Sequence, residues 1–568
     1  MRWSIKPKHD PETVNAFARE LGIDAVLSQL LLQRGIDTFD KARNFFRPSM
    51  DQLHDPFLMQ DMNLAVERIL TAMELGESIM VYGDYDVDGT TSVTLMSTFL
   101  TDSLGYDRVM TYIPDRYTEG YGVSYTGIDV AGEKDVSLII ALDCGVKAVE
   151  KVDYAKRKGI DFIICDHHRP GKKLPDAIAV LDPKRTDCNY PYDELCGCGV
   201  GFKLAQALCQ AQQIEREHLT PYLDLVATAI GADIVPITGE NRVLCYFGMQ
   251  VINSNPRPGF QAFIDGMDKK KILSVRDVVF TIAPRINAAG RMEHALGAVK
   301  LLTAKDLDEA RVIAGDIENN NNDRKESDRS ATQEALQQIE DLGEQDRSTT
   351  VVFHKKWHKG VIGIVASRLI ETYYRPTLVF TRSNGDRLAA SARSVKGFDV
   401  YNALEQCSEF IEQFGGHKYA AGLTLKIDQY DAFKARFEEV VTATIHEKDK
   451  EEELIADSEL NLRQIDARFY RVLKQLAPFG PGNMRPMFLS QQVYDAGYTK
   501  CVGQDDAHLK LNVKQKDSQP INGIAFSRGS DCELLKSKKP VDLMYILDEN
   551  HWNGNVSIEL MVRDIRPS

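Results

Sequence analysis

Four apolar runs in the first half of the chain each lead into an aspartate, and this repetition constrains the fold more than any other feature. Short apolar runs that alternate with helical patterns are typical of parallel strands buried on both faces. The carboxyl ends of parallel strands meet at one edge of a sheet, so we expect these aspartates to line one crevice. The sequence therefore predicts an α/β fold with a parallel sheet. The runs are SIMVY, VSLIIAL, GIDFIIC and DAIAVL, and the aspartates are Asp84, Asp143, Asp166 and Asp182.

The segment GDYDVDGTTS after the first run carries Asp84, Asp86 and Asp88 at a spacing of two, with a helix expected to begin near Thr90. Residues two apart share a face of an extended segment, and three carboxylates there would repel one another without a cation. Hard divalent cations prefer such oxygen ligands. A single aspartate after a strand is more often a turn or helix-capping residue, but acidic residues at several strand ends favour a metal site.

His167 and His168 follow the third strand directly after Asp166. A mixed set of carboxylates and imidazoles favours Mn²⁺ or Mg²⁺ over Zn²⁺. Cys196 and Cys198 also have the spacing of zinc ligands, but the chain offers no second pair. We interpret these two as buried structural cysteines.

The length of 568 residues predicts three to five domains. The long polar helical stretch carries four consecutive asparagines at 319–322, which lower helix propensity but do not preclude a solvated helix. After it comes a second α/β pattern, and then short strands separated by turn residues, which fit a small β barrel. The predicted segments are an N-terminal extension (1–49), an α/β domain (50–304), a connecting helix (305–345), a smaller α/β domain (346–446) and a β domain (447–568).

Composition narrows the classes of protein that this chain could be. Asp and Glu outnumber Lys and Arg by 83 to 69, and the net charge of −14 argues against a protein that coats nucleic acid through its overall field. A local basic groove remains compatible with this charge. The ten cysteines form no regular framework, and we find neither a signal-peptide pattern nor an apolar run of about 18 residues. We predict a cytoplasmic protein without a membrane span.

Several motifs resemble those of a known family. GDYDVDG, ALDCG and DHH resemble the first three motifs of the DHH phosphoesterase superfamily, and GADIVP, which contains Asp233, resembles the fourth. PRINAAGRM, SARS and GGHKYAAG resemble phosphate-binding signatures of the RecJ exonucleases, the last two in the DHH-associated domain. The resemblance covers about residues 50–568. It implies a parallel-sheet DHH domain, a smaller α/β DHH-associated domain and a C-terminal OB-like barrel.

The resemblance also implies a site for two Mn²⁺ or Mg²⁺ ions. Tyr82 stands where small pyrophosphatases of the superfamily have a histidine, and Asp84 could replace that ligand. We assign His168 to the scissile phosphate, as a charged hydrogen-bond donor, so the catalytic set is His168 together with the ligands. The implied ligands are Asp86, Asp88, Asp143 as the bridge between the ions, His167 and Asp233, with Asp84 as a further acidic residue.

Recognition of a DNA end requires phosphate contacts elsewhere in the chain. The planar fork of arginine binds phosphate through two hydrogen bonds, and glycines let backbone N–H groups approach it closely. Any one of these arginines could instead form a surface ion pair. By resemblance, some of the candidates form a 5′-phosphate pocket. The candidates are Arg116, Arg285, Arg291, Ser391, Arg393, Gly415, Gly416 and His417.

The activity implied by the resemblance is a single-stranded-DNA-specific 5′→3′ exonuclease that releases 5′-mononucleotides in recombination and repair. Single-strand-binding protein and a helicase are the implied partners, and a monomer is expected. One alternative is a DHH phosphodiesterase for short oligonucleotides or cyclic dinucleotides, but such proteins are shorter and lack the terminal β domain. Another is a non-catalytic DNA-binding scaffold, against which the intact Asp and His set counts.

The terminal β domain could stack bases on aromatic side chains, as OB folds do. We expect core packing for most of its aromatic residues. The residues in question are Phe479, Tyr494, Tyr498, Phe526 and Trp552.

Overall fold

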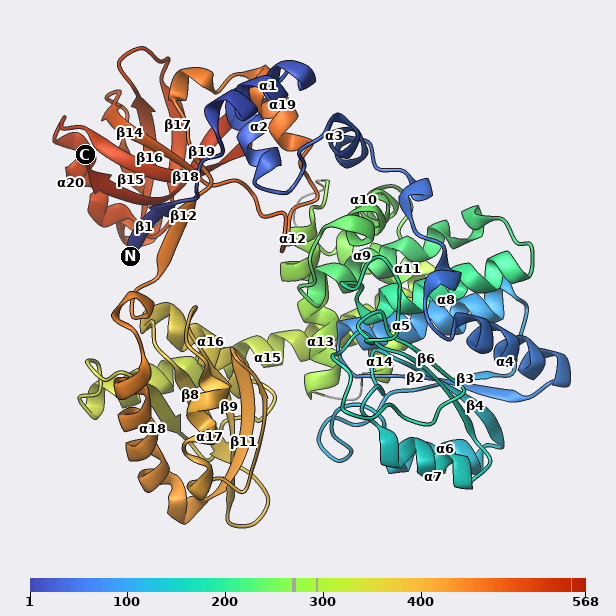
Figure 1. Cartoon of the computed structure of the whole chain (residues 1–568). Coiled ribbons are helices and arrows are strands. Elements are labelled where there is room, and N and C mark those ends of the chain that lie inside the picture. Colours follow the sequence, from blue (N-terminus) through green and yellow to red (C-terminus); the bar gives the residue numbers. More distant parts are fainter. Residues whose placement is uncertain (268–271, 293–294, 553) are drawn as a thin grey trace. The chain divides into compact units, whose positions relative to one another are not determined.

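The computed structural model describes residues 1–267, 272–292, 295–552 and 554–568 (Figure 1). The chain forms two compact units that do not follow the order of the sequence. The larger unit holds Trp3–Pro114, Glu119–Ala283 and Leu454–Ser568, and the smaller holds Met1–Arg2, Asp115–Thr118 and Pro284–Glu453. Within the described residues, no helix combines the length and the apolar character that a membrane-spanning segment needs.

The larger unit contains a five-stranded sheet with the order β3-β2-β4-β5-β6 (Figure 1). Every neighbouring pair in it is parallel, which confirms the predicted sheet. Strands β2, β4 and β5 are almost continuously buried, as expected where helices cover a parallel sheet, whereas the edge strand β3 is half-buried along its length. The strands are β2 (Ser78–Gly83), β3 (Val109–Tyr112), β4 (Val136–Leu142), β5 (Asp161–Cys165) and β6 (Ala179–Leu181).

Helices alternate with strands β2 to β5 of this sheet along the chain, and further helices follow its last strand, β6. The two that follow β6 first, α8 and α9, are almost entirely buried. The helices are α4 (Met62–Leu75), α5 (Val87–Thr98), α6 (Tyr125–Glu133), α7 (Val149–Arg157), α8 (Gly197–Ala211), α9 (Leu223–Ala232), α10 (Gly239–Ser254), α11 (Pro258–Asp265) and α12 (Val275–Asp277).

The C-terminal strands close into a barrel. The sheet order is β13-β14-β18-β19-β17-β16-β15, and an additional pairing of β14 with β16 closes the ring. Closure removes the exposed edges that an open sheet would leave. The predicted β barrel is thus confirmed. Its strands are β13 (Ser458–Glu459), β14 (Phe488–Asp495), β15 (Lys500–Val502), β16 (His508–Lys514), β17 (Ile521–Ala525), β18 (Val541–Trp552) and β19 (Asn555–Pro567).

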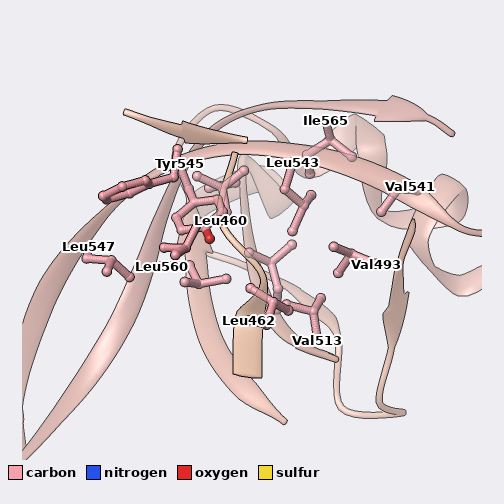
Figure 2. Close-up of a cluster of buried hydrophobic side chains, with 14 of the residues drawn as sticks. Leu460, Leu462, Val493, Val513, Val541, Leu543, Tyr545, Leu547, Leu560 and Ile565 are labelled. Carbon is pink, nitrogen blue, oxygen red and sulfur yellow. The ribbon is translucent and has the colours of Figure 1, made fainter. Parts of the chain in front are cut away.

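Alternating apolar residues of these strands fill the barrel, among them Leu543, Tyr545 and Leu560 (Figure 2). Leu27 and Leu30 of α2 (Ala25–Leu32) join the same core, next to α19 (Ala467–Lys474). The N-terminal segment, which also forms β1 (Arg2–Ile5), α1 (Pro11–Leu21) and α3 (Phe39–Phe46), therefore contributes to the barrel core through α2.

The aromatic residues of the barrel region differ in exposure. Tyr498 and Phe526 are 78% and 56% exposed, whereas Phe479 is half-buried against the barrel core and Tyr494 is half-buried. The side chain of Trp552 lies outside the described residues. Of the four whose side chains the structure describes, Tyr498 and Phe526 are therefore the two that present a large face to solvent.

The smaller unit contains a mixed sheet with the order β10-β11-β9-β8-β7. Only β7 and β8 pair in parallel; the other neighbours are antiparallel. Two apolar cores accompany this sheet, one with α17 and α18 and one with α16. The elements are β7 (Thr350–Phe353), α16 (Ile362–Thr372), β8 (Thr377–Arg382), β9 (Arg387–Arg393), α17 (Val400–Glu405), β10 (Gln413–His417), β11 (Ala420–Lys426) and α18 (Tyr430–Thr444).

A single helix, α15 (Leu307–Asp341), spans the polar stretch, so the predicted long helix is confirmed. Asp306 caps it by accepting hydrogen bonds from two backbone N–H groups of the first turn. The asparagine run does not break it, and Asn321 is buried. Ala331, Ala335 and Ile339 pack against residues of α16, and this tertiary contact offsets the weak helix propensity of the asparagines. Before it come α13 (Ala283–Met292) and α14 (Leu296–Thr303).

Candidate metal and phosphate sites

The carboxyl ends of the central strands lie in one row, as the sequence predicts. In the strand registers, Gly83 pairs with Leu142, Leu142 with Cys165, and Cys165 with Leu181. The residues that follow these ends are the four aspartates that the sequence singled out. Because β2 lies between β3 and β4, the strand order reverses here, and ligands of open α/β sheets bind at such points.

The first motif folds differently from the prediction. Helix α5 begins at Val87, not near Thr90, because the carboxylate of Asp86 caps it and accepts a hydrogen bond from Gly89 N at 3.0 Å. A Cβ atom at position 89 would lie 2.3 Å from the backbone oxygen of Asp84, so only glycine fits this turn. The three carboxylates therefore do not line an extended face. Asp84 follows the strand, Asp86 caps the helix, and Asp88 lies in its first turn.

Four of the predicted residues converge around the imidazole of His167. Its Nε2 lies 3.2 Å from Asp143 Oδ1, 3.5 Å from Asp233 Oδ2 and 3.8 Å from Asp88 Oδ2. Asp143 follows β4, His167 follows β5, Asp88 belongs to α5, and Asp233 ends α9. Strand ends and helix ends that are distant in sequence thus bring ligand-type atoms to one point.

The protonation of this cluster indicates that it suits a cation. Burial and then the charges of neighbouring aspartates raise the pKa values of Asp88 and Asp143 well above the usual range. Burial and then Asp86 raise the pKa of Asp233 to about 7. Burial and then His168 lower the pKa of His167 to about 3, so this imidazole is neutral and can donate a lone pair.

Unpartnered polar atoms support the same conclusion. Asp143 Oδ1 and His167 Nε2 are buried and have no hydrogen-bond partner among the residues that the structure describes, which is costly unless something else satisfies them. Two overlapping groups could each hold an ion: Asp88 with His167 and Asp233, and Asp143 with His167 and His168. A divalent cation would satisfy the orphaned atoms and offset the repulsion between the carboxylates.

Asp84 and Asp86 lie outside these two groups but close to them. The charge of Asp86 contributes to the raised pKa values of Asp88, Asp143 and Asp233, so its carboxylate faces the same centre. Asp84 is fully buried, and its Oδ1 accepts a hydrogen bond from Gly122 N at 3.3 Å. The structure thus brings all the predicted acidic residues to one region and gives them different local roles.

His168 is held in place by residues that the sequence prediction did not assign. Its Nδ1 lies 2.7 Å from Asp166 Oδ1, and its Nε2 lies 3.1 Å from the hydroxyl of Tyr121. Burial lowers the pKa of His168, but the hydrogen bond and charge of Asp166 outweigh it and raise the pKa above its usual value. The ring therefore favours the protonated form that a phosphate-binding donor requires.

The Cys196-Gly-Cys198 segment positions Asp88. Cys196 caps α8, and the backbone N–H groups of Gly197 and Cys198 donate to the two oxygens of Asp88, both at 2.7 Å. A Cβ atom at Gly197 would lie 2.5 Å from Asp143 Cβ, so the glycine is required. Both cysteines are buried and free, as predicted. In the sequence, Gly197 between the two cysteines was the available sign that the backbone here approaches another group closely.

In the smaller unit, several arginines lie close enough together for their charges to lower one another's pKa. Burial, and then the positive charges of Arg116, Arg324 and Arg393, lower the pKa of Arg291 to about 10. Arg291 donates to the carbonyl of Gly360 at 2.9 Å, and Arg393 donates to Ser391 Oγ at 3.0 Å. Guanidinium groups that repel one another in a partly buried setting favour an anion bound close to them.

The remaining phosphate candidates join this group to different degrees. Strand pairing aligns Gly415 with Gly422 and Ser391, and His417 with Ala420 and Arg393. Gly416 has φ +146°, and a Cβ atom there would lie 2.4 Å from the Ala420 carbonyl oxygen. Arg285 forms an ion pair with Glu318 of α15.

The sequence prediction missed two contributors to this region. Arg324 lies on α15, within the stretch interpreted only as a connector. The second contributor is the first turn of α16, because Gly363 in that turn lies directly beside the guanidinium of Arg393. A Cβ atom at Gly363 would lie 2.9 Å from Arg393 Nη2. The charge run DRKESDR was the available signal for Arg324.

Three family models match the chain: the DHH family N-terminal domain at residues 78–230, the DHHA1 domain at 346–443 and the RecJ OB domain at 456–564. The single-stranded-DNA-specific exonuclease RecJ of Bacillus subtilis (strain 168) is 35% identical over 567 residues, covering 99% of this chain and 70% of that protein. The protein of the same name from Escherichia coli (strain K12) is 34% identical, covering 89% of this chain and 90% of that protein.

A crystal structure of RecJ from Thermus thermophilus in complex with Mn²⁺ superimposes with a TM-score of 0.86 at 26% identity. It covers 100% of this chain and 80% of that chain. Sequence and fold agree, and the chain belongs to the RecJ family of single-stranded-DNA-specific exonucleases.

Proposed function

We propose that this protein hydrolyses single-stranded DNA from its 5′ end and releases 5′-mononucleotides, using two Mn²⁺ or Mg²⁺ ions. The observation that carries the proposal is the convergence of Asp88, Asp143 and Asp233 on the neutral imidazole of His167. In this proposal these four residues would hold the ions, with Asp143 as the shared ligand, and Asp86 and Asp84 would complete the acidic set.

The chain's own residues would orient the substrate around these ions. Two divalent ions bound close together lower the pKa of bound water and clamp the non-bridging oxygens of a phosphate. His168 faces the same centre from the next position in the chain, and its bond to Asp166 fixes the ring so that Nε2 is the nitrogen left to donate. In this role it binds the scissile phosphate and stabilises charge that develops there.

Selection of the 5′ end falls to the arginine group of the smaller unit. Arg116, Arg291 and Arg393, with Ser391, are suited to a terminal phosphate because a bound anion would offset the repulsion between the positive charges of these arginines. Gly415, Gly416 and His417 on β10, which β11 separates from the strand of Ser391 and Arg393, would add backbone and side-chain donors. Arg285 is a weaker candidate because it forms an ion pair with Glu318.

The deciding experiment follows strands labelled at the 5′ phosphate, both single and duplex, in the presence of Mn²⁺. We expect labelled mononucleotides from the single strand only, and none with Asp143→Ala. Tight binding without cleavage under both Mn²⁺ and Mg²⁺ would favour a scaffold, and release of product from a 3′ label first would reverse the proposed polarity. Cleavage restricted to di- or trinucleotides or cyclic dinucleotides would favour the phosphodiesterase alternative.

The cellular context is proposed from the family. Single-strand-binding protein and a helicase are the proposed partners in recombination and repair, with the chain acting as a monomer in the cytoplasm. The proposed domains are an N-terminal extension (1–49), the DHH domain (50–304), the connecting helix (305–345), the DHH-associated domain (346–446) and the OB domain (447–568).

A further inference from the structure

The loop that follows Asp233 has a conformation that its own sequence does not favour. It joins α9 to α10, and Ile234 in it has φ +61°. A β-branched residue in the left-handed region is strained by about 1–2 kcal/mol. The side chain of Ile234 is 69% exposed, so its own burial does not compensate for the strain. Contacts from outside the loop must therefore hold this conformation.

A turn of the OB domain, residues 477–483, supplies the closest of these contacts. The backbone N–H of Ile237 donates to the carbonyl of Pro481 at 2.7 Å. Gly480 lies so close to Ile237 that an added Cβ atom would be 2.4 Å from its Cδ1 atom, and the equivalent atom at Gly482 would be 2.9 Å from Thr238 Cγ2. The glycines of this turn thus let its backbone pack directly onto the loop.

The turn is itself held rigidly. Gly480 and Asn483 exchange backbone hydrogen bonds at 3.1 and 2.9 Å. The side chain of Asn483 donates to the carbonyls of Leu476 and Pro478, and it accepts from Arg34 Nε at 2.8 Å. Every one of these partners belongs to the same compact unit as Asp233.

A buried arginine fastens the turn to the helix that follows the loop. Arg242, in the first turns of α10, donates to the carbonyls of Leu476 and Ala477, both at 2.9 Å, and to the carbonyl of Phe45 at 3.0 Å. Its guanidinium also lies 3.6 Å from the centre of the Phe45 ring. On its other side, the loop is held by Asn241, whose side chain donates to the carbonyl of Pro236 at 3.0 Å.

We infer that the turn at residues 477–483 is a positioning element of the metal site: it holds the strained loop and thereby fixes Asp233 for metal binding. The inference rests on the proposed metal site and assigns the OB domain a second task besides DNA binding. In this role Gly480 and Gly482 act through the loop that carries Asp233, which their backbone contacts. Partners that orient a ligand typically contribute about 10–100-fold to metal affinity.

The test compares Gly480→Ala with wild type in the full chain, without DNA. We expect the Mn²⁺ dissociation constant, measured by electron paramagnetic resonance of free Mn²⁺, to rise about tenfold or more. Hydrogen exchange of the amides of Ile234, Val235 and Ile237 should accelerate, and cleavage should recover at high Mn²⁺. Affinity for single-stranded DNA in EDTA should stay unchanged.

Two further variants separate positioning from general damage. Ile237→Ala removes the side-chain atoms that an alanine at position 480 would clash with, because the remaining Cβ atom lies 3.8 Å from the added methyl group. The double variant Gly480→Ala with Ile237→Ala should therefore bind Mn²⁺ more tightly than Gly480→Ala alone. Gly523→Ala is the matched control, because it crowds Leu511 and Leu560 at 2.9 Å within the same barrel, away from the loop. It should lower stability without changing Mn²⁺ affinity.

Each outcome decides between the two proposals. If wild type binds Mn²⁺ and cleaves while Gly480→Ala keeps wild-type Mn²⁺ affinity, the positioning inference is overturned and the proposed function stands. If wild type neither binds Mn²⁺ nor cleaves, the proposed function itself fails. Should Gly480→Ala not fold, hydrogen exchange on wild type still decides, because an Ile237 amide that exchanges as fast as an exposed one contradicts the inference.

Discussion

Replacement of His168 by alanine separates metal binding from the handling of phosphate. His168 contributes two side-chain contacts, one to Asp166 Oδ1 at 2.7 Å and one to Tyr121 at 3.1 Å. In the variant, Asp166 still accepts backbone hydrogen bonds from Val146 at 2.9 Å and from His167 at 2.7 Å. The backbone that carries His167 therefore stays anchored. We expect the Mn²⁺ dissociation constant to stay within a few-fold of wild type.

The expected loss lies in turnover. Removal of a preorganised donor to the reacting group typically lowers kcat by about 10²–10³, equivalent to about 2.7–4 kcal/mol. The lost hydrogen bond between charged groups is worth about 1.5–3 kcal/mol at most for stability, so the variant should remain folded. The assay measures kcat at saturating Mn²⁺ on 5′-phosphorylated single strand, together with Mn²⁺ titration of the same preparation.

His167→Ala is the matched control, since its Nε2 lies at the centre of the carboxylates. This variant should lose Mn²⁺ affinity as well as turnover. A large loss of Mn²⁺ affinity in His168→Ala would refute the reasoning and make His168 a ligand, which its position near Asp143 and His167 permits geometrically. Unchanged turnover in His168→Ala would equally remove its assigned role at the scissile phosphate.

Further predictions concern charge and end recognition. Arg291→Ala should reduce the preference for a 5′-phosphorylated over a 5′-hydroxyl strand by about tenfold or more, since charged hydrogen bonds contribute about 1.5–3 kcal/mol. The control Arg387→Ala should leave this preference unchanged, because the exposed side chain of Arg387 pairs with Glu412. Equal effects of the two substitutions would contradict the phosphate pocket. DNA affinity should fall with salt at a log–log slope of about −0.7 per neutralised phosphate, and a flat response would argue against a basic channel. In EDTA, the raised pKa of Asp233, about 7, stabilises the metal-free fold at low pH. As the pH rises from about 4 to about 7, the free energy of unfolding should fall by about 1.4 kcal/mol per pH unit from this contribution. Asp233→Asn should remove this fall from a plot of thermal stability against pH. Identical plots for wild type and variant would contradict the raised pKa.

The sequence predicted the parts of the site that depend on local pattern. Each strand run ends in its aspartate, and parallel strands must end at a common edge, so convergence of Asp143 and Asp166 followed from the pattern alone. The predicted start of α5, near Thr90, was wrong by three residues. The prediction treated Asp86 as part of an extended acidic face, whereas its carboxylate caps the helix. A capping aspartate and a ligand aspartate look identical in the sequence.

Other features depended on contacts between segments that are distant in the chain. Nothing near Asp88 in the sequence indicates that the backbone of Gly197 and Cys198 would hold its carboxylate. Nothing near Asp233 indicates a turn of the OB domain as its support. Charge patterning placed Arg324 on a solvated connector, whereas its charge contributes to the lowered pKa of Arg291.

The sequence by itself thus determined the architecture, the kind of metal ligand and the family, because hydrophobic period and strand-end chemistry are written in consecutive residues. Only the tertiary structure decided which carboxylates share a centre, how their pKa values shift, and at which positions no residue larger than glycine fits. Those properties arise from burial and from contacts between residues that are remote along the chain, and folding alone brings such residues together.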